Sequence, residues 1–263
     1  MPTAGQNAEA PCSTSRETSG LDYRPDIDGL RAIAVLGVVL FHTDLGASGG
    51  YVGVDVFFVI SGYLITSLMI KDVRRGSFSL QRFWERRIRR ILPALTTVTL
   101  ATVAAGWFLL IPAEFTDLGK SVISLVLLAS NVFFQNNTNY FGSISDDVPL
   151  LHTWSLAVEE QFYLIFPLLV AVCARLRVAS LYPVLAAIAA GSLGLSVYQT
   201  AFARAHAFYL LPARAWELLT GALLALPEAR PCDQPTSQRE LAAAAGLALV
   251  LASACCYGRE TPF

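Results

Sequence analysis

An arginine and a histidine occupy the apolar segment DIDGLRAIAVLGVVLFHT, residues 26–43. An α-helix turns by about 100° per residue, so eleven residues make three turns and about 20° more. Arg31 and His42 are therefore predicted to lie on one stripe of a helix, about 16 Å apart along its axis. Asp28 precedes Arg31 by three residues and can reach the same side. A charge at the centre of a bilayer costs about 2.5–3.5 kcal/mol on insertion scales, so this stripe is a candidate for function.

The next apolar segment, GGYVGVDVFFVISGYLI at residues 49–65, contains a single charged residue, Asp55. Its glycine-rich start lets two helices approach closely, and an acid there could orient the His42 imidazole as a general base requires. Three plainer explanations stay open. Asp55 could be a helix N-terminal carboxylate near water, Arg31 an interfacial anchor and His42 an ordinary hydrogen-bonded residue.

A third polar stripe is predicted in LLHTWSLAVEEQFYLIFP, residues 150–167. His152 and Glu159 are seven residues apart, within about 20° of one helix face, and Tyr163 follows on the same stripe. Glu160 points about 100° away from Glu159. Such a set of polar groups requires a protein interior or a water-filled cavity if the helix spans a membrane. The alternative is an amphipathic helix that lies on the surface.

Two further sets of charges have a strong structural explanation. Segment 71–90 holds eight of the nineteen Lys and Arg against two acids. Clustered arginines suit a polyphosphate ligand, although such a run after a span can be only a topology signal. Arg214 and Glu217 are three residues apart in LPARAWELLTGALL, and an internal ion pair that holds helices together is the favoured interpretation.

The composition indicates an integral membrane protein. Hydrophobic residues make up 54% of the 263 positions and charged residues 15%, against about 25% charged in an ordinary soluble domain. Apolar windows of about twenty residues recur along the chain, and each can span a bilayer. The predicted fold is an all-α, polytopic helical bundle with about eight transmembrane helices, at residues 28–45, 51–70, 91–111, 116–134, 152–174, 181–198, 208–227 and 240–257.

The charge bias predicts the orientation of the first spans. Because cytoplasmic loops are enriched in Lys and Arg, segment 71–90 is predicted to face the cytoplasm and turn 45–51 to face outside. Residues 1–22 are polar and are predicted to be a disordered tail, and residues 23–263 form one membrane domain. No cleaved signal peptide is expected before the first span, because no apolar region with a small-residue cleavage site precedes it. No metal site is expected, since the cysteines have no metal-like spacing.

Together these segments resemble the acyltransferase 3 family of bacterial membrane acyltransferases. The resemblance rests on five motifs in order: YRPDIDGLRAIAVLGVVLFH, GGYVGVDVFFVISGYLIT, RFWERRIRRILPAL, LLHTWSLAVEEQFYLIFPLL and RAWELLTGALLA. It implies a multi-pass enzyme of the bacterial inner membrane that moves an acyl group, commonly acetyl, from acyl-coenzyme A to a hydroxyl of a carbohydrate or similar acceptor. The family usually has about ten spans, so the resemblance also implies that C-terminal helices are missing here.

The resemblance assigns roles to the polar residues. It implies that His42 is the catalytic base and that Arg31 holds the donor or its thioester. Glu159, and with it Asp55, would orient an imidazole or steer a proton, and His152 opens the family's HTWS signature. The family's Arg-x-x-Arg motif falls on Arg87 and Arg90, which would grip the phosphates of coenzyme A. An overlapping second pair is formed by Arg86 and Arg89.

Two other functional classes stay open at this stage. A secondary transporter would also bury acids, arginines and histidines in a helical bundle. An inactive truncated remnant, or a partner subunit, would follow from the early end of the chain. Membrane lipids and a carbohydrate or glycolipid acceptor are the expected partners, and no nucleic acid is expected. The acyl group, the acceptor and the oligomeric state are left open.

Overall fold

The computed structural model describes residues 24–43, 45–137, 148–176, 180–226 and 236–258, and these residues form α-helices and no β-strand. In chain order the helices are α1 (Pro25–His42), α2 (Val52–Arg74), α3 (Leu80–Leu109), α4 (Pro112–Val126), α5 (Ser130–Asn137), α6 (Thr153–Arg175), α7 (Leu181–Phe202), α8 (Arg204–Tyr209), α9 (Leu211–Ala225) and α10 (Thr236–Cys256). The all-α prediction is confirmed for this part of the chain. The predicted tail, residues 1–22, lies outside the described residues.

Four described helices are long and apolar enough to cross a membrane, namely α2, α3, α6 and α7. The predicted count of about eight spans is therefore not confirmed. Helix α1 has the length of a span, 18 residues, but carries Asp26, Asp28 and Arg31. The apolar part of α10, Glu240–Cys256, is shorter than the other four.

Two of the predicted spans are broken into separate helices. Residues 116–134 belong to α4 and α5, and the chain turns between them at Leu128, whose φ is +55°. Residues 208–227 cover the end of α8 and all of α9. Leu210 between those two helices is extended, and a proline in the first turn of α9 suits a helix start.

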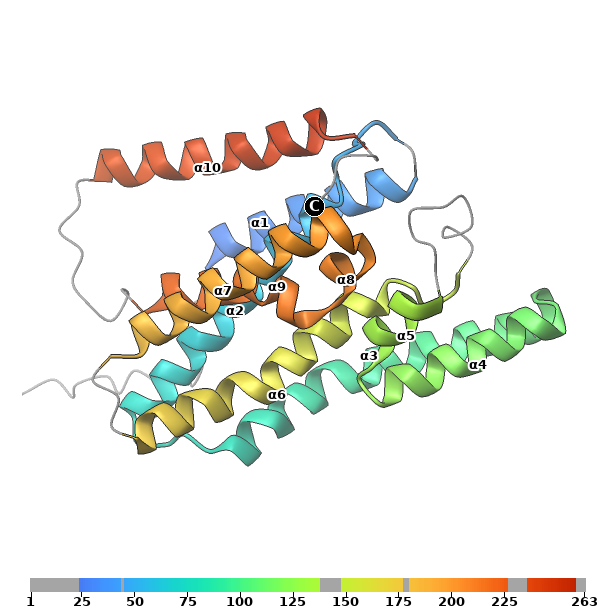
Figure 1. Ribbon diagram of the computed structural model, residues 1–263, viewed down its shortest axis with the longest axis horizontal. Helices are drawn as coiled ribbons and strands as arrows, with labels where there is room; N and C mark the ends of the chain where they lie inside the picture. The colour runs from blue at the N-terminus through green and yellow to red at the C-terminus, as the bar shows by residue number, and fades with distance from the viewer. Residues whose placement is uncertain (1–23, 44, 138–147, 177–179, 227–235, 259–263) are drawn as a thin grey trace, which may run out of the picture.

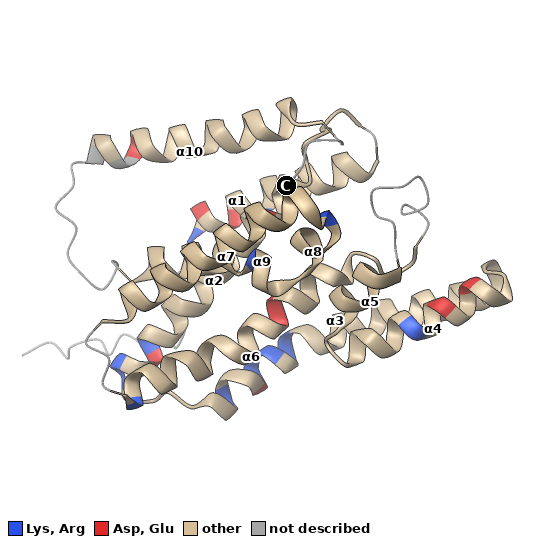
Figure 2. Cartoon of the chain, in the orientation of Figure 1, with Lys and Arg blue, Asp and Glu red and all other residues tan. Residues whose placement is uncertain are grey.

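Most of the basic segment 71–90 belongs to two helices. Helix α2 continues to Arg74, and α3 begins at Leu80, where the Ser79 side chain accepts a hydrogen bond from the backbone N–H of Arg82 at 3.5 Å. Figure 2 shows Lys and Arg gathered where α2 ends and along the first turns of α3. The basic residues are thus held on the ends of two rigid helices.

Helices α2, α7 and α9 lie side by side in the middle of the bundle (Figure 1). The contact between α2 and α9 is close because each helix presents a glycine to the other. A Cβ added at Gly62 would collide with the carbonyl oxygen of Leu218, and one added at Gly221 with the carbonyl oxygen of Val59. Around this contact the buried side chains of α2, α6 and α9, together with others from α3, α5, α7 and α8, form the hydrophobic core.

Other helices leave apolar surface uncovered. The end of α3 and the length of α4 extend beyond the bundle (Figure 1), and Trp107, Phe108 and Leu109 are largely exposed there. Such a surface is costly in water and suits the hydrocarbon of a bilayer. Helix α10 runs along one edge of the molecule (Figure 1) and is joined to the turn before α2 by its C-terminal end. There the Gly49 N–H donates to the carbonyl oxygen of Ala254 at 3.0 Å, and the Ser48 hydroxyl to that of Tyr257 at 2.6 Å.

Candidate active site

One continuous helix carries both Arg31 and His42, as the spacing predicts. The Arg31 side chain is 39% exposed, and its Nη1 lies 3.6 Å from Asp28 Oδ1. His42 is the last residue of α1, and its Nδ1 lies 2.9 Å from the carbonyl oxygen of Val38. Because a carbonyl oxygen only accepts hydrogen bonds, Nδ1 carries the proton and the neutral ring has its lone pair on Nε2. The geometry therefore prepares Nε2 of His42 to accept a proton.

A second imidazole lies near the first. His152 directly precedes α6, and the surrounding protein atoms lower its pKa below the ordinary value of 6.5. The positive charge of a protonated His42 lowers the pKa of His152 further, so the two rings are within electrostatic reach of each other. His42 and His152, called the histidine pair below, thus bring together the end of α1 and the start of α6.

Asp55 contacts an arginine instead of an imidazole. Its Oδ1 accepts a hydrogen bond from Arg214 Nη1 at 2.8 Å, and the same Nη1 donates to Glu217 Oε1 at 2.7 Å. Within the described residues, Asp55 makes no hydrogen bond to His42 or His152. The predicted pair of Arg214 and Glu217 is therefore present, and Asp55 makes it a buried triad across the α2–α9 contact.

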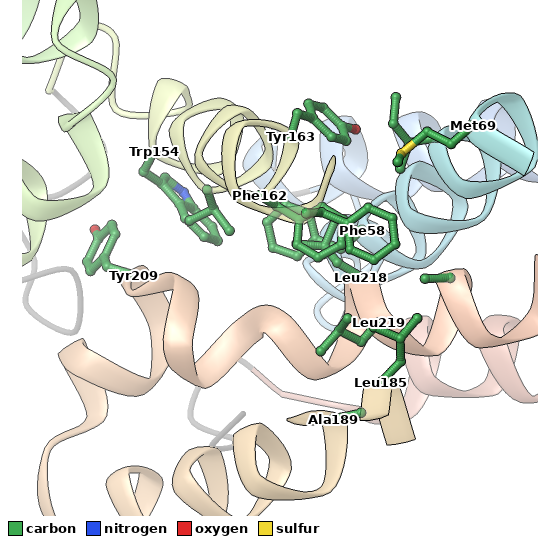
Figure 3. Packing of buried hydrophobic residues seen from close by; sticks show 14 of the residues in the cluster. Phe58, Met69, Trp154, Phe162, Tyr163, Leu185, Ala189, Tyr209, Leu218 and Leu219 are labelled. Carbon is green, nitrogen blue, oxygen red and sulfur yellow. The ribbon is translucent and has the colours of Figure 1, made fainter. Parts of the chain in front are cut away.

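The buried triad is enclosed by backbone and aromatic rings. Arg214 is only 4% exposed, and its Nε donates to the carbonyl oxygen of Phe208 at 3.1 Å. The guanidinium carbon lies 5.2 Å from the centre of the Phe208 ring and 5.9 Å from that of Trp154. Figure 3 shows Trp154 next to Tyr209 and close to the core residue Phe58. Asp55 is the only charged residue at the start of α2, and this isolation is the sequence signal that pointed to the site. The sequence alone does not reveal that its partner is Arg214, 159 residues away.

Glu159 is held by two hydroxyl groups. Its Oε1 accepts from the Ser61 hydroxyl at 2.9 Å, and its Oε2 from the Tyr163 hydroxyl at 3.2 Å. The predicted stripe thus brings Glu159 and Tyr163 together, whereas sequence reasoning did not single out Ser61. Seven residues of helix, about 10 Å, separate Glu159 from His152, so the carboxylate and the histidine pair lie at different depths.

Arg87 faces α6 from the first turns of α3. Its Nη2 lies 3.2 Å from Glu160 Oε1, and its guanidinium carbon lies 3.7 Å from the centre of the Tyr163 ring. The Trp84 indole donates to the carbonyl oxygen of Tyr163 at 3.1 Å, which fixes the same contact. Nε of Arg87 is buried and has no hydrogen-bond partner among the described residues.

The other predicted phosphate-binding arginines lie on the outside of α3. Arg86 pairs with Asp72 at 2.6 Å and Arg89 with Glu85 at 2.7 Å. Arg90 is exposed and makes no ion pair with any described residue. Beside them an open hollow of about 490 Å³ runs along α3, lined by Gln81, Trp84, Glu85, Ile88 and Arg89.

Comparison with known proteins gives a consistent picture. The family model described as an acyltransferase domain matches residues 24–262. The "Putative peptidoglycan O-acetyltransferase YrhL" of Bacillus subtilis (strain 168) is 38% identical over 213 residues, which are 78% of this chain and 33% of that protein. The "O-acetyltransferase OatA" of Staphylococcus aureus (strain NCTC 8325) is 42% identical over 151 residues, 56% of this chain and 25% of that protein.

This chain spans about a third of the length of the first of these relatives and a quarter of the second. No solved structure matches it. The match of the family model extends from the first described residue to the end of α10, and it includes every helix that contributes to the histidine pair, the buried triad and the arginines of α3. The chain belongs to the acyltransferase 3 family.

Proposed function

We propose that this chain is the membrane part of an O-acyltransferase. It moves an acyl group, commonly acetyl, from cytoplasmic acyl-coenzyme A to a hydroxyl of a cell-envelope carbohydrate at the bacterial inner membrane. The observation that carries the proposal is the 2.9 Å contact between His42 Nδ1 and the Val38 carbonyl oxygen, which places the ring proton on Nδ1 and leaves Nε2 to act as a base. The names of both relatives support acetyl as the group, and the name of the Bacillus subtilis relative supports peptidoglycan as the acceptor class.

The chemistry follows from this base. Nε2 of His42 takes the proton of the acceptor hydroxyl, and the oxygen forms a bond to the carbonyl carbon of the thioester. The C–S bond breaks, and the departing thiolate takes a proton to become the thiol. His152 remains neutral beside His42, since its lowered pKa keeps a second positive charge away from the imidazolium that forms.

The donor binds at the basic end of the bundle. Arg90, Arg86 and Arg89 are on the outside of α3, where guanidinium groups can form bidentate contacts with the phosphates of coenzyme A. Arg87 contributes from within, since its buried Nε is directed at no described protein atom. Arg31 is partly exposed and lies near the start of α1. It holds the thioester end of acyl-coenzyme A.

The orientation of the chain follows the charge bias. The basic ends of α2 and α3 face the cytoplasm, and the histidine pair lies at the opposite end, beside the turn that faces outside. Glu159 lies between the two ends and steers a proton, through hydrogen bonds to Ser61 and Tyr163. The thioester and the alcohol then meet from opposite sides of the membrane.

Mass spectrometry of cell-envelope glycans tests the proposal. Cells that lack the gene are complemented with the wild-type gene, with His42→Ala or with Arg90→Gln, and protein levels in the membrane are matched. Wild type restores an acyl-shifted glycan species, and His42→Ala does not. The reason is that general base catalysis raises the rate of such a transfer by about 10²–10⁴-fold. Arg90→Gln restores it only when acyl-coenzyme A is abundant. Glycans that are identical with and without the gene, together with uptake or export of an unmodified solute, would favour a transporter instead.

A further inference from the structure

The buried triad contains one more acid than base. Arg214 supplies one positive charge, whereas Asp55 and Glu217 would supply two negative charges if both were ionised. Among the described residues, these are the charged groups that act on Glu217. A fully ionised triad would therefore leave one negative charge without compensation inside the protein, which is strongly unfavourable.

The excess charge falls on Glu217. Its side chain is 2% exposed, whereas that of Asp55 is 31% exposed and can still contact water. Glu217 Oε1 accepts from Arg214, but Oε2 is buried and has no hydrogen-bond partner in the described structure. The neighbouring Leu218 is fully buried against α2, so the packing of the two helices closes this site from one side.

We infer that the buried triad is a proton-binding site, in which Glu217 carries one proton on Oε2 and Asp55 remains ionised beside Arg214. A neutral Glu217 removes the uncompensated charge and keeps both hydrogen bonds that Nη1 of Arg214 donates. A metal ion fits this place poorly, because hard cations take six or more oxygen ligands and the described residues offer no group of three potential ligands.

A proton site here has a use in the proposed acyl transfer, on which this role rests. The proton that His42 takes from the acceptor must leave the imidazole before the next turnover, and the departing thiolate must gain a proton. Trp154 lies two residues after His152 and contacts the guanidinium of Arg214, so the triad adjoins the histidine pair. Glu217 then supplies its proton to the departing thiolate during a turnover and takes up the one that His42 removed from the acceptor hydroxyl.

Infrared spectroscopy of the purified chain in lipid nanodiscs tests the proton site without any activity. At neutral pH the wild type is expected to show the C=O stretch of a protonated carboxyl group, shifted in D₂O, that is absent from Glu217→Gln. Glu160→Gln is the matched control, since Glu160 forms an ion pair with Arg87 and lies outside the triad, and this variant must keep the band. A wild-type spectrum identical to that of Glu217→Gln in this region would overturn the inference.

A pair of variants tests the role. Glutamine has the shape of a protonated glutamate but cannot exchange a proton, so Glu217→Gln should match the wild type in membrane abundance and thermal stability and lose acyl transfer. Glu217→Ala should lose stability as well. Full transfer by Glu217→Gln would refute the proton-exchange role, and instability equal to that of Glu217→Ala would refute a protonated Glu217. If the wild type itself transfers no acyl group, the proposed function fails, and the infrared band still decides the proton site.

Discussion

Arg214 and Arg87 each lie beside an acid and an aromatic ring, and the difference between their surroundings is instructive. Arg214 is 4% exposed and has two acids, Asp55 and Glu217. Arg87 is 18% exposed and forms an ion pair with one acid, Glu160. That ion pair is partly exposed on both sides, which is an ordinary way to join two helices. At Arg214 two acids share one guanidinium that is almost fully buried, so the same residue types form a site that stores charge or a proton.

The helix contacts around the two arginines differ in the same sense. Around Arg214, helices α2 and α9 touch backbone to backbone through Gly62 and Gly221. Around Arg87, helices α3 and α6 are joined by long side chains, with Trp84 and Arg87 reaching across to Tyr163. A backbone contact admits little adjustment, whereas a contact through long side chains can shift by changing rotamers. We therefore expect the α2–α9 contact to be the more sensitive to substitution.

The largest expected effect is that of Arg214→Met. Removing the guanidinium leaves Asp55 and Glu217 together without a cation, at a cost of about 3–5 kcal/mol in unfolding free energy. Membrane abundance and thermal unfolding in detergent measure this loss. Arg90→Met is the control, because Arg90 is exposed, and its stability should equal that of the wild type. An Arg214→Met protein that melts with the wild type would remove the distinction between the two arginines.

The second largest expected loss of stability is that of Gly221→Ala. The added Cβ would collide with the Val59 carbonyl oxygen and the Tyr63 backbone nitrogen, and overpacking costs typically about 1–3 kcal/mol. Gly119→Ala in α4 is the matched control, since a Cβ there meets no atom within 4 Å. That control should gain about 0.5–1 kcal/mol from helix propensity. Equal melting temperatures for the two variants would show that α2 and α9 are not in close contact.

A smaller loss is expected for Arg87→Met. The variant loses the ion pair with Glu160 and the contact with the Tyr163 ring, together about 1–2 kcal/mol. The double variant Arg87→Met/Glu160→Gln should recover part of the loss, because Glu160 is then no longer a carboxylate without its cation. Thermal unfolding of the four proteins in the cycle measures the coupling. A double variant no more stable than the single one would mean that the ion pair contributes nothing.

The smallest effect is that of pH through His152. Its pKa in the folded protein is below 6.5, so the unfolded chain binds more protons there as the pH falls through that value. The histidine therefore opposes folding below about pH 6.5 and has no effect above it. The slope of stability against pH is measured from melting temperatures between about pH 5 and pH 8, the range in which histidine titrates. His152→Gln should flatten the slope at the acidic end, and an unchanged slope would assign it to other groups.

The sequence predicts well those features that depend on one helix. The stripe that joins Arg31 and His42 needs only an unbroken helix from 31 to 42, and the structure has one. Glu159 and Tyr163 are neighbours for the same reason, and their side chains form a hydrogen bond. Arg214 and Glu217 are a third example at spacing i, i+3. In the last two cases the helical period alone decides which side chains meet.

Features that depend on two helices could not be predicted in the same way. Asp55 was expected beside an imidazole, yet it meets Arg214 because α9 packs on α2 through glycines. The sequence grouped Arg87 with Arg90 as candidate phosphate ligands, and it gave no sign of the Tyr163 ring and Glu160, which hold Arg87 against α6. The break at Leu128 also has no local signal, since a positive φ normally calls for glycine or asparagine.

The junction between α10 and the turn before α2 has a consequence for how the two segments become ordered. The last carbonyl groups of a helix have no partner within it, and here one of them, at Ala254, accepts from the backbone N–H of Gly49. The C-terminal end of α10 is thus capped by a segment about two hundred positions earlier in the sequence, through main-chain atoms that every residue has. The hydrogen bond places no demand on the side chain at position 254, but it fixes the register of α10, because a shift by one residue along the helix would rotate the capped carbonyl by about 100° away from the turn that follows His42.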